Sequence, residues 1–310
     1  MPEPPERQLR LSVGITTRNR PKSLRRCVAS LDRLADLLTD ILVVDDSSDI
    51  PLEPVLDDLP TRLRTKLTLI RQPAREGYIV ARNTIVARAH SEVVLLMDDD
   101  AFLLDDGGVR RALDLMAGHS KIGALACALA HEDGSPWPSA MQPSPAGYVS
   151  YVPAYIGFAH LVRRRLFLDL GGYRELFHFY GEEKDYCLRV INAGYHVIYD
   201  PQALVAHMVD PSGRSDIRYL RYAIRNDCLS SLYNEPLPLP LMTIPLRLYR
   251  FGKMRRHGGV HDPDGLRWIV AEILHALPIV IRDRRPVRWA SLRRWRWLRR
   301  AWPAFRPEPA

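Results

Sequence analysis

Short apolar runs alternate with helical patterns through the first half of the chain. Four runs rich in β-branched and aliphatic residues are predicted strands: residues 9–16, 41–44, 66–70 and 92–97. Apolar residues spaced three and four apart predict helices over 24–38, with Pro21 in the first turn, and over 78–90. The last strand is continuously apolar from Val93, which is typical of burial on both faces. The pattern predicts an α/β fold, Rossmann-like, with a mostly parallel central sheet flanked by helices.

The second half of the chain is less regular. Five prolines punctuate residues 131–153, and we interpret this stretch as a loop that forms a mobile flap over a site. A helix is predicted over 183–193, ending at Gly194, and a strand over 195–199. Residues 236–246 are uncharged but broken by four prolines, and residues 266–281 have the spacing of an apolar-faced helix. Neither segment has the roughly 20 apolar residues that a membrane span requires.

These changes divide the chain into three predicted parts. Residues 1–8 are expected to be disordered, residues 9–235 to form the main domain, and residues 236–310 to form a helical, basic appendage. The first ten residues lack an apolar core, so no signal peptide is predicted. The four cysteines are far apart and form no CxxC pair, which favours a reducing compartment. We therefore expect a cytoplasmic protein.

The net charge of +8 is concentrated at the C-terminal end. Residues 282–310 contain ten arginines and two acidic residues, so the rest of the chain is neutral overall. Trp289, Trp295 and Trp302 recur among these arginines at helical spacing. Because Arg and Trp together favour a membrane interface, residues 266–310 are predicted to attach the protein to the anionic inner face of a membrane. Packing on the main domain is the alternative, and nucleic-acid binding is less favoured because no recognised nucleic-acid module accompanies the tail.

An acidic triplet follows the apolar strand over residues 92–97. Asp98, Asp99 and Asp100 place three carboxylates at the end of a buried strand, where they repel one another unless a cation compensates. Oxygen ligands suit Mg²⁺ or Mn²⁺, which also bridge the phosphates of a nucleotide. For the triplet alone, an ordinary exposed acidic turn is the alternative.

Other candidate residues extend this chemistry. Asp46 follows the strand over 41–44 and so reaches the same edge of the sheet, although acids after strands are also common turn formers. Glu182 and Glu183 precede a predicted helix, whose dipole helps to keep a carboxylate ionised, as a general base requires. The alternative is the ordinary preference of acids for a helix N-terminus. His207 is a candidate third metal ligand, although a lone histidine is more often structural.

In combination, these motifs resemble family 2 glycosyltransferases with the GT-A fold. The resemblance covers roughly residues 10–230. The motifs that carry it are, in chain order, residues 13–20, 43–49, 77, 81–83, 96–100, 171–173, 179–183, 188–189, 199–201 and 205–207. Two positions depart from the family pattern. Glu183 stands where the family usually has Asp, and Arg174 replaces a frequent acid.

The resemblance implies a set of roles. The residues implied to contact the donor nucleotide are Thr16, Arg18, Asp46, Gly77, Arg82, Asn83, Asp98 and Asp99. Mn²⁺ or Mg²⁺ is held by Asp98, Asp100 and His207. Glu183 is the catalytic base, and the acceptor side comprises Gly172, Tyr173, Tyr180 and Glu182.

The implied reaction is an inverting transfer of a sugar from a nucleotide-sugar donor to an acceptor hydroxyl. The acceptor is expected to be a glycan, a glycolipid or a small molecule, in glycolipid, polysaccharide or cell-envelope glycan synthesis. Two alternatives are a nucleotide-sugar-binding scaffold without transfer activity and a nucleotidyltransferase. A nucleotidyltransferase would release pyrophosphate and would have no use for Glu183 and His207.

Overall fold

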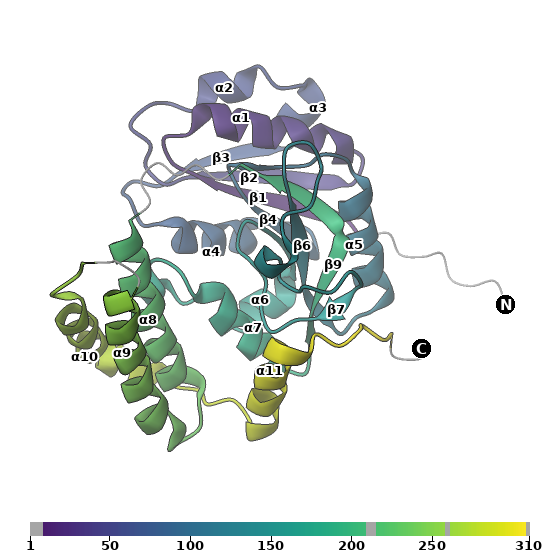
Figure 1. Cartoon of the computed structure of the whole chain (residues 1–310). Helices are drawn as coiled ribbons and strands as arrows, with labels where there is room; N and C mark the ends of the chain where they lie inside the picture. Colours follow the sequence, from purple (N-terminus) through teal and green to yellow (C-terminus); the bar gives the residue numbers. More distant parts are fainter. Residues whose placement is uncertain (1–8, 209–214, 258–260, 308–310) are drawn as a thin grey trace.

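The computed structural model describes residues 9–208, 215–257 and 261–307. In this part of the chain, nine strands form one sheet with helices on both faces (Figure 1). The α/β fold expected from the sequence is confirmed. The predicted disorder of residues 1–8 lies outside the described residues.

The sheet combines a parallel half with a mixed half. Its strands are β1 (Leu11–Thr17), β2 (Leu38–Asp45), β3 (Leu67–Arg71), β4 (Val93–Asp98), β5 (Ala101–Phe102), β6 (Ile122–Ala130), β7 (Ser150–Tyr151), β8 (Ala159–Arg163) and β9 (His196–His207). Their order is β3-β2-β1-β4-β8-β6-β9-β5, with β7 beside β9. In the parallel half, Thr16 lies opposite Asp98 and Thr17 opposite Asp45. The carboxyl ends of β1, β2 and β4 therefore meet at one edge, where ligands bind in sheets of this kind.

The helices predicted over 78–90, 183–193 and 266–281 are present, and two other predictions need correction. They are α1 (Pro21–Ser30), α2 (Glu53–Asp57), α3 (Thr61–Arg64), α4 (Tyr78–Arg88), α5 (Gly107–Gly118), α6 (Arg164–Asp169), α7 (Glu182–Asn192), α8 (Asp216–Asn234), α9 (Leu239–His257), α10 (Gly265–Asp283) and α11 (Trp289–Ala301), with 3₁₀ turns η1 (Leu31–Leu34), η2 (Ser139–Met141) and η3 (Glu175–Phe177). The helix predicted over 24–38 is shorter, because Leu38 is the first residue of β2. The segment over 236–246, expected to be broken, is helical from Leu239 and accommodates Pro245 inside α9.

Strand β4 shows why its sequence is continuously apolar. Val93, Leu95 and Met97 belong to one core, which includes side chains of α1 and α5. Val94 and Leu96 belong to the other core, which includes side chains of α4 and α7. Because successive side chains of a strand point to opposite faces, a strand covered on both sides needs apolar residues throughout. The predicted burial of this strand on both faces is confirmed.

A glycine in β1 brings α4 close to the sheet. A Cβ atom at Gly14 would lie only 2.1 Å from Cγ2 of Ile85 on α4, so a larger residue would push the helix away. The same helix carries Arg82, whose side chain is buried. The close packing at Gly14 thus helps to set the position of Arg82 relative to the sheet.

The C-terminal helices pack on the main domain. Leu292, Trp295 and Leu298 of α11 are buried in the same core as Tyr186 of α7, and Trp295 Nε1 donates to the carbonyl of Pro153 at 3.0 Å. This part of the apolar stripe predicted to face a membrane is therefore used in packing instead. Among the described residues, the structure contains no helix that is both long and apolar enough to cross a membrane.

Candidate active site

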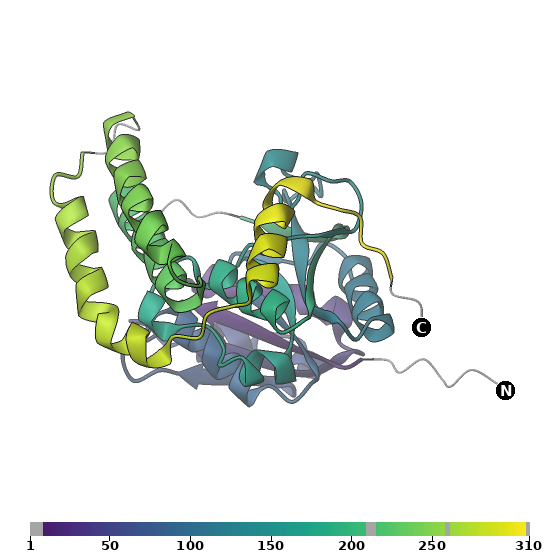
Figure 2. The ribbon, with the colours of Figure 1, turned by 90° about the horizontal axis from the view of Figure 1, so that it is seen from below.

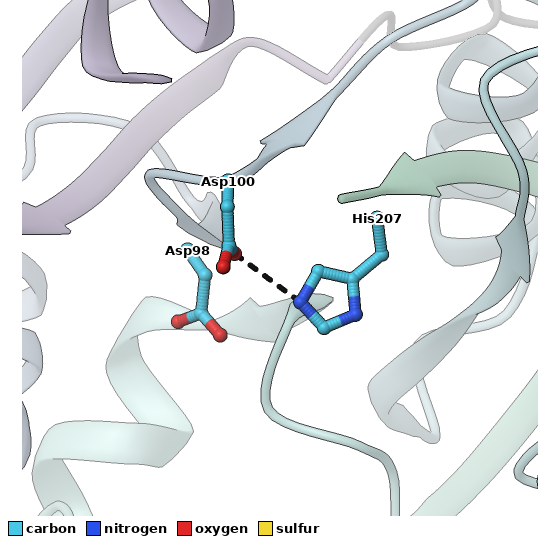
Figure 3. Close-up of side chains that lie close together, drawn as sticks. All are labelled: Asp98, Asp100 and His207. Atoms are coloured by element: carbon cyan, nitrogen blue, oxygen red, sulfur yellow. Dashed lines mark ion pairs between the residues drawn. The ribbon is translucent and has the colours of Figure 1, made fainter. Parts of the chain in front are cut away.

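Three side chains with metal-binding groups meet where β4 and β9 end. Asp98 is the last residue of β4, Asp100 follows in the turn to β5, and His207 is the last residue of β9. One ligand atom from each residue lies within 4.8 Å of the other two. The carboxylates point toward the imidazole, and His207 Nε2 lies 3.2 Å from Asp100 Oδ1 (Figure 3). The structure thus brings together the three residues that the family resemblance implied as metal ligands.

The surroundings of this cluster fit a divalent cation. Asp100 Oδ1 is buried and makes no hydrogen bond of good geometry within the described residues, an arrangement that costs free energy unless a cation compensates. The His207 ring lies between the rings of Phe158 and Trp137, with centroids 5.1 and 5.9 Å away, which holds the imidazole in place. Two carboxylates with one imidazole are a suitable donor set for Mn²⁺ or Mg²⁺.

Trp137 also locates the loop over residues 131–153. Its stacking on His207 places this loop beside the acidic cluster, as the sequence led us to expect. Trp137 and Phe158 were not among the predicted site residues, because ring stacking between distant segments has no local sequence signal. The mobility of the loop stays a prediction.

Asp99 is not part of the cluster of Asp98, Asp100 and His207. Thr17 Oγ1 donates to Asp99 Oδ2 at 2.7 Å, and Arg20 Nη1 lies 3.2 Å from Asp99 Oδ1 and 3.1 Å from Asp100 Oδ2. Burial, opposed by Thr17 and Arg20, raises the pKa of Asp99 to about 6. Arg20 was missed at the sequence level, although it follows Arg18 closely after the first strand and is the side chain that ties two aspartates of the triplet together.

Arg82 connects the two acidic groups of the site. Its guanidinium is buried, with Nη2 2.7 Å from Asp98 Oδ1 and Nη1 3.0 Å from Glu182 Oε1. Nη2 also donates to the carbonyl of Gly157 at 2.8 Å. Burial lowers the pKa of Arg82, but the carboxylates of Asp98 and Glu182 outweigh it and hold the pKa above its usual value. The guanidinium is therefore a permanent positive charge between a metal-cluster aspartate and α7.

The two glutamates at the start of α7 differ in access. Glu182 is fully buried, and its Oε2 accepts a hydrogen bond from the Tyr78 hydroxyl at 3.2 Å. The Glu183 side chain keeps 16% of its surface exposed, and its Oε1 lies 3.8 Å from Arg82 Nη1. Burial is the main cause that raises the pKa of each glutamate above its usual value. Of the pair, only Glu183 combines a raised pKa with access to a bound molecule.

Gly157 lies directly against the Glu183 carboxylate. A Cβ atom at this position would lie 2.3 Å from Glu183 Oε1 and 3.0 Å from Arg82 Nη1. No sequence motif pointed to Gly157, because its importance comes from a contact between segments that are distant in the chain.

Three of the residues predicted to bind the nucleotide, Thr16, Arg18 and Asp46, lie at the ends of β1 and β2. Asp46 Oδ1 accepts hydrogen bonds from the backbone N–H groups of Glu76 and Gly77 at 2.7 and 2.9 Å. Gly77 has a φ of 92°, which favours glycine, and precedes α4. Thr16 is buried, and Arg18 is half-buried with no hydrogen-bond partner for its buried Nε atom among the described residues.

Asn83, predicted as a donor contact, is hydrogen-bonded to the backbone at Tyr173. Its Nδ2 donates to the carbonyl of Tyr173 at 2.9 Å, and its Oδ1 accepts from the N–H of Tyr173 at 2.9 Å. Gly172, with a φ of 64°, provides the tight turn that this contact needs, since a Cβ there would lie 2.8 Å from Asn83 Oδ1. Both polar groups of the Asn83 side chain are therefore committed within the protein.

The predicted acceptor residues separate into buried and exposed ones. Tyr173 is only 1% exposed, and its hydroxyl lies 2.7 Å from both the Tyr155 hydroxyl and His160 Nε2. Its expected contact with an acceptor is not possible in this conformation, and it acts as a core residue. Tyr180 is 40% exposed, with its hydroxyl accepting from that of Tyr219 at 2.8 Å. Tyr180 therefore stays accessible to a ligand.

Comparison with known proteins identifies a family. Residues 12–171 match the family Glycosyl transferase family 2. This region contains the acidic triplet and Arg82 but ends before Glu183 and His207. The chain is 31% identical over 212 residues to a pre-mycofactocin glycosyltransferase of Mycobacterium tuberculosis, a match that covers 64% of this chain and 42% of that protein. The chain therefore matches less than half the length of this relative.

Solved structures share the fold at low sequence identity. The mannosyltransferase PcManGT of Pyrobaculum calidifontis, in complex with GDP-Man and Mn²⁺, is 18% identical with a TM-score of 0.59, over 89% of this chain and 83% of that one. Residues 1–349 of TarS from S. aureus, in complex with UDP-GlcNAc, are 16% identical with a TM-score of 0.57, over 89% and 82% of the two chains. These similarities support the GT-A fold.

Proposed function

Since this chain belongs to glycosyl transferase family 2, we propose that it transfers a sugar from a nucleoside diphosphate sugar to an acceptor hydroxyl. The observation that carries the proposal is the arrangement around Arg82. One buried guanidinium contacts Asp98 of the metal cluster and Glu182 of α7, and lies 3.8 Å from Glu183. A cation site for the leaving diphosphate and a carboxylate for the attacking hydroxyl thus lie on the two sides of one residue.

Asp98, Asp100 and His207 would hold the divalent cation, Mn²⁺ or Mg²⁺. When bound, such an ion offsets the negative charge that develops on the departing diphosphate. The complexes of PcManGT with GDP-Man and Mn²⁺ and of TarS with UDP-GlcNAc support a nucleotide-sugar donor. Thr16, Arg18 and Asp46, at the adjoining strand ends, would seat the nucleotide, with Gly77 beneath it.

Glu183 would act as the general base. Its carboxylate accepts the proton of the acceptor hydroxyl while the acceptor oxygen forms a bond to the anomeric carbon. The bond from that carbon to the diphosphate oxygen breaks, and the diphosphate leaves with the electron pair, so that the anomeric configuration inverts. A raised pKa makes Glu183 a better proton acceptor than an ordinary exposed glutamate. Glu182, paired with Arg82, would hold the base in position, and Tyr180 would border the acceptor.

The acceptor class is also part of the proposal. A glycan, a glycolipid or a small molecule would supply the hydroxyl, and the exposed Tyr180, whose N–H donates to the Tyr78 hydroxyl beside Glu182, would contact it. A cytoplasmic location, with the donor supplied from the same compartment, accompanies this assignment.

Two measurements test the function. Nucleotide sugars are screened for Mn²⁺-dependent thermal stabilisation, because a ligand that binds only the folded state raises the melting temperature. The stabilising donor is then incubated with candidate acceptors, and release of nucleoside diphosphate is measured. Release of pyrophosphate instead would indicate a nucleotidyltransferase, and stabilisation without any turnover would indicate a binding scaffold.

The variant Glu183→Gln separates binding from chemistry. It is expected to reduce turnover by about 10² to 10⁴-fold while leaving Mn²⁺-dependent nucleotide binding, measured by calorimetry, nearly unchanged. Glu53→Gln, which alters an exposed glutamate in α2, is the matched control. Unchanged turnover in Glu183→Gln would remove Glu183 from the mechanism.

A further inference from the structure

A groove between α9 and α11 lies outside the active site. It has a volume of about 640 Å³ and is lined by Thr243 and Arg250 of α9 and by Arg296, Trp297, Arg299 and Arg300 of α11. Figure 1 shows these helices below the sheet, at the end of the molecule opposite α1–α3. Figure 2 shows them on the same side of the sheet when the molecule is turned. None of the lining residues takes part in the proposed transfer.

The groove carries a concentration of positive charge. The sequences of α9 and α11 contain five basic residues each and no acidic residue. Arg296 Nη2 lies 3.3 Å from Glu235 Oε1, and Arg299 lies over the Trp295 ring at 5.2 Å. Within the described residues, Arg250 and Arg300 form no ion pair. Positive charge that the protein does not neutralise itself favours an anionic partner.

Large apolar side chains are exposed beside these arginines. On α9, Met242, Leu246 and Tyr249 are 67%, 47% and 70% exposed. Their spacing of four and three residues puts them on one side of the helix, next to Arg250. On α11, Trp297 is 54% exposed and itself lines the groove. Exposed apolar side chains rimmed by cations are typical of a surface that lies at a lipid interface.

We propose that the groove and the exposed sides of α9 and α11 bind the surface of an anionic phospholipid membrane. Arg250 and Arg300 contact headgroup phosphates, while Tyr249 and Trp297 lie at the boundary between headgroups and acyl chains, where aromatic residues are enriched. The aliphatic residues Met242 and Leu246 favour lipid over nucleic acid, because bases and phosphates offer no comparable apolar layer.

This proposal differs from the expectation based on the sequence. The predicted attachment covered residues 266–310, whose Leu292, Trp295 and Leu298 are buried in the protein. The contact surface instead combines the outer side of α11 with α9, a helix that precedes the predicted segment. It is independent of the transfer reaction, so the failure of either proposal leaves the other standing.

Cosedimentation of the full chain with vesicles tests the surface. The protein is expected to bind vesicles of phosphatidylcholine with phosphatidylglycerol, to bind phosphatidylcholine alone weakly, and to dissociate as salt is raised. The double variant Arg250→Gln/Arg300→Gln is expected to weaken partitioning by roughly 30-fold, since each basic residue near an anionic surface contributes to binding. Met242→Ser/Tyr249→Ser is expected to weaken it as well.

The matched control is Arg33→Gln/Arg88→Gln. It removes the same charge from η1 and α4, which do not line the groove, and is expected to bind like the wild type. Melting temperatures of all variants show that the loss is not caused by unfolding. Equal binding by the groove variant and the wild type would overturn the proposal.

Two further outcomes would assign the groove to another ligand. Stabilisation by inorganic phosphate that depends on Arg250 and Arg300, without vesicle binding, would make it a site for a soluble phosphate. Binding of a single-stranded oligonucleotide in place of vesicles, lost in the same variant, would make it a nucleic-acid site. Either result would refute attachment to a membrane.

Discussion

Arg82 Nη2 lies 2.7 Å from Asp98 Oδ1, and this contact ties the metal cluster to the start of α7. Asp98 thus has one partner in the protein before any cation arrives, and its carboxylate is held at the end of β4. The opposite side of the same guanidinium contacts Glu182. We therefore expect Arg82 to act as a positioning residue for both halves of the proposed site.

Removal of Arg82 is expected to destabilise the fold. Arg82→Ala removes the charged partner of Asp98 and of the buried Glu182, and loss of a buried charge partner typically costs about 3–5 kcal/mol of unfolding free energy. Urea unfolding measures this loss, and added Mn²⁺ should restore part of it by compensating Asp98. Arg88→Ala, at an exposed position of the same helix, serves as the control and should change stability by less than about 0.5 kcal/mol. Similar stability losses in the two variants would contradict the positioning role.

Gly157→Ala is expected to impair the base selectively. The added Cβ would lie 2.3 Å from Glu183 Oε1, so the flexible carboxylate must move away from its position. We expect turnover to fall by roughly 10- to 100-fold, while donor binding measured by calorimetry stays within about twofold. Gly118→Ala places a methyl group where no atom lies within 4 Å and should leave both quantities unchanged. Full turnover in Gly157→Ala would show that Glu183 does not need its present position.

Stabilisation by Mn²⁺ should depend on Asp100 and His207. At a Mn²⁺ concentration 100 times the dissociation constant, the wild type should gain about 2.7 kcal/mol of unfolding free energy. Asp100→Asn and His207→Ala are expected to lose most of this gain, because each removes one ligand of the cluster. Thermal unfolding with and without Mn²⁺ measures the difference. Asp105→Asn, in the turn before α5, controls for a general effect of lost negative charge, and an undiminished gain in His207→Ala would exclude it as a ligand.

Acid should weaken the fold through Asp185. This buried carboxylate lies 2.9 Å from Arg189 Nε and 3.2 Å from Arg174 Nε, and although burial opposes it, these charges hold the pKa of Asp185 below its usual value. A carboxyl with a lower pKa in the folded state contributes stability above its unfolded pKa of about 3.9. That contribution is lost as the pH falls through the folded value.

The stability advantage of the wild type over Asp185→Asn, measured by urea titration from neutral pH down to about pH 3, should therefore shrink with acidification. The raised pKa values of Asp99, Glu182 and Glu183 change stability in the opposite direction but are common to both proteins. Asp185→Asn should be less stable at neutral pH and should show a shallower fall in acid. Asp57→Asn, at an exposed position in α2, should keep the steep dependence of the wild type. Parallel curves for Asp185→Asn and the wild type would assign the acid sensitivity to other carboxyls.

The sequence by itself determined the elements and the composition of the active edge. Apolar spacing predicted β4 and α7, because burial on one or both faces imposes a local period on the chain. The order of the motifs was enough to indicate the family, and the resemblance predicted that Asp98, Asp100 and His207 bind one metal ion. Boundaries were less accurate where two elements adjoin, as at Leu38, whose apolar side chain fits either a helix or a strand.

Only the tertiary structure decided which side chains meet. Tyr173 belongs to a motif of the predicted site, yet it is buried, and Asn83 hydrogen-bonds to its backbone. Arg20 and Gly157 gain their importance from contacts across the sheet edge, which no local pattern records. Helix α11 likewise buries Leu292, Trp295 and Leu298 in the protein, whereas its Trp297 lines the groove. The physical reason is that the apolar period of a segment indicates which of its faces are buried. Which other segment covers such a face depends on the order of the strands and on the path of the connections between them.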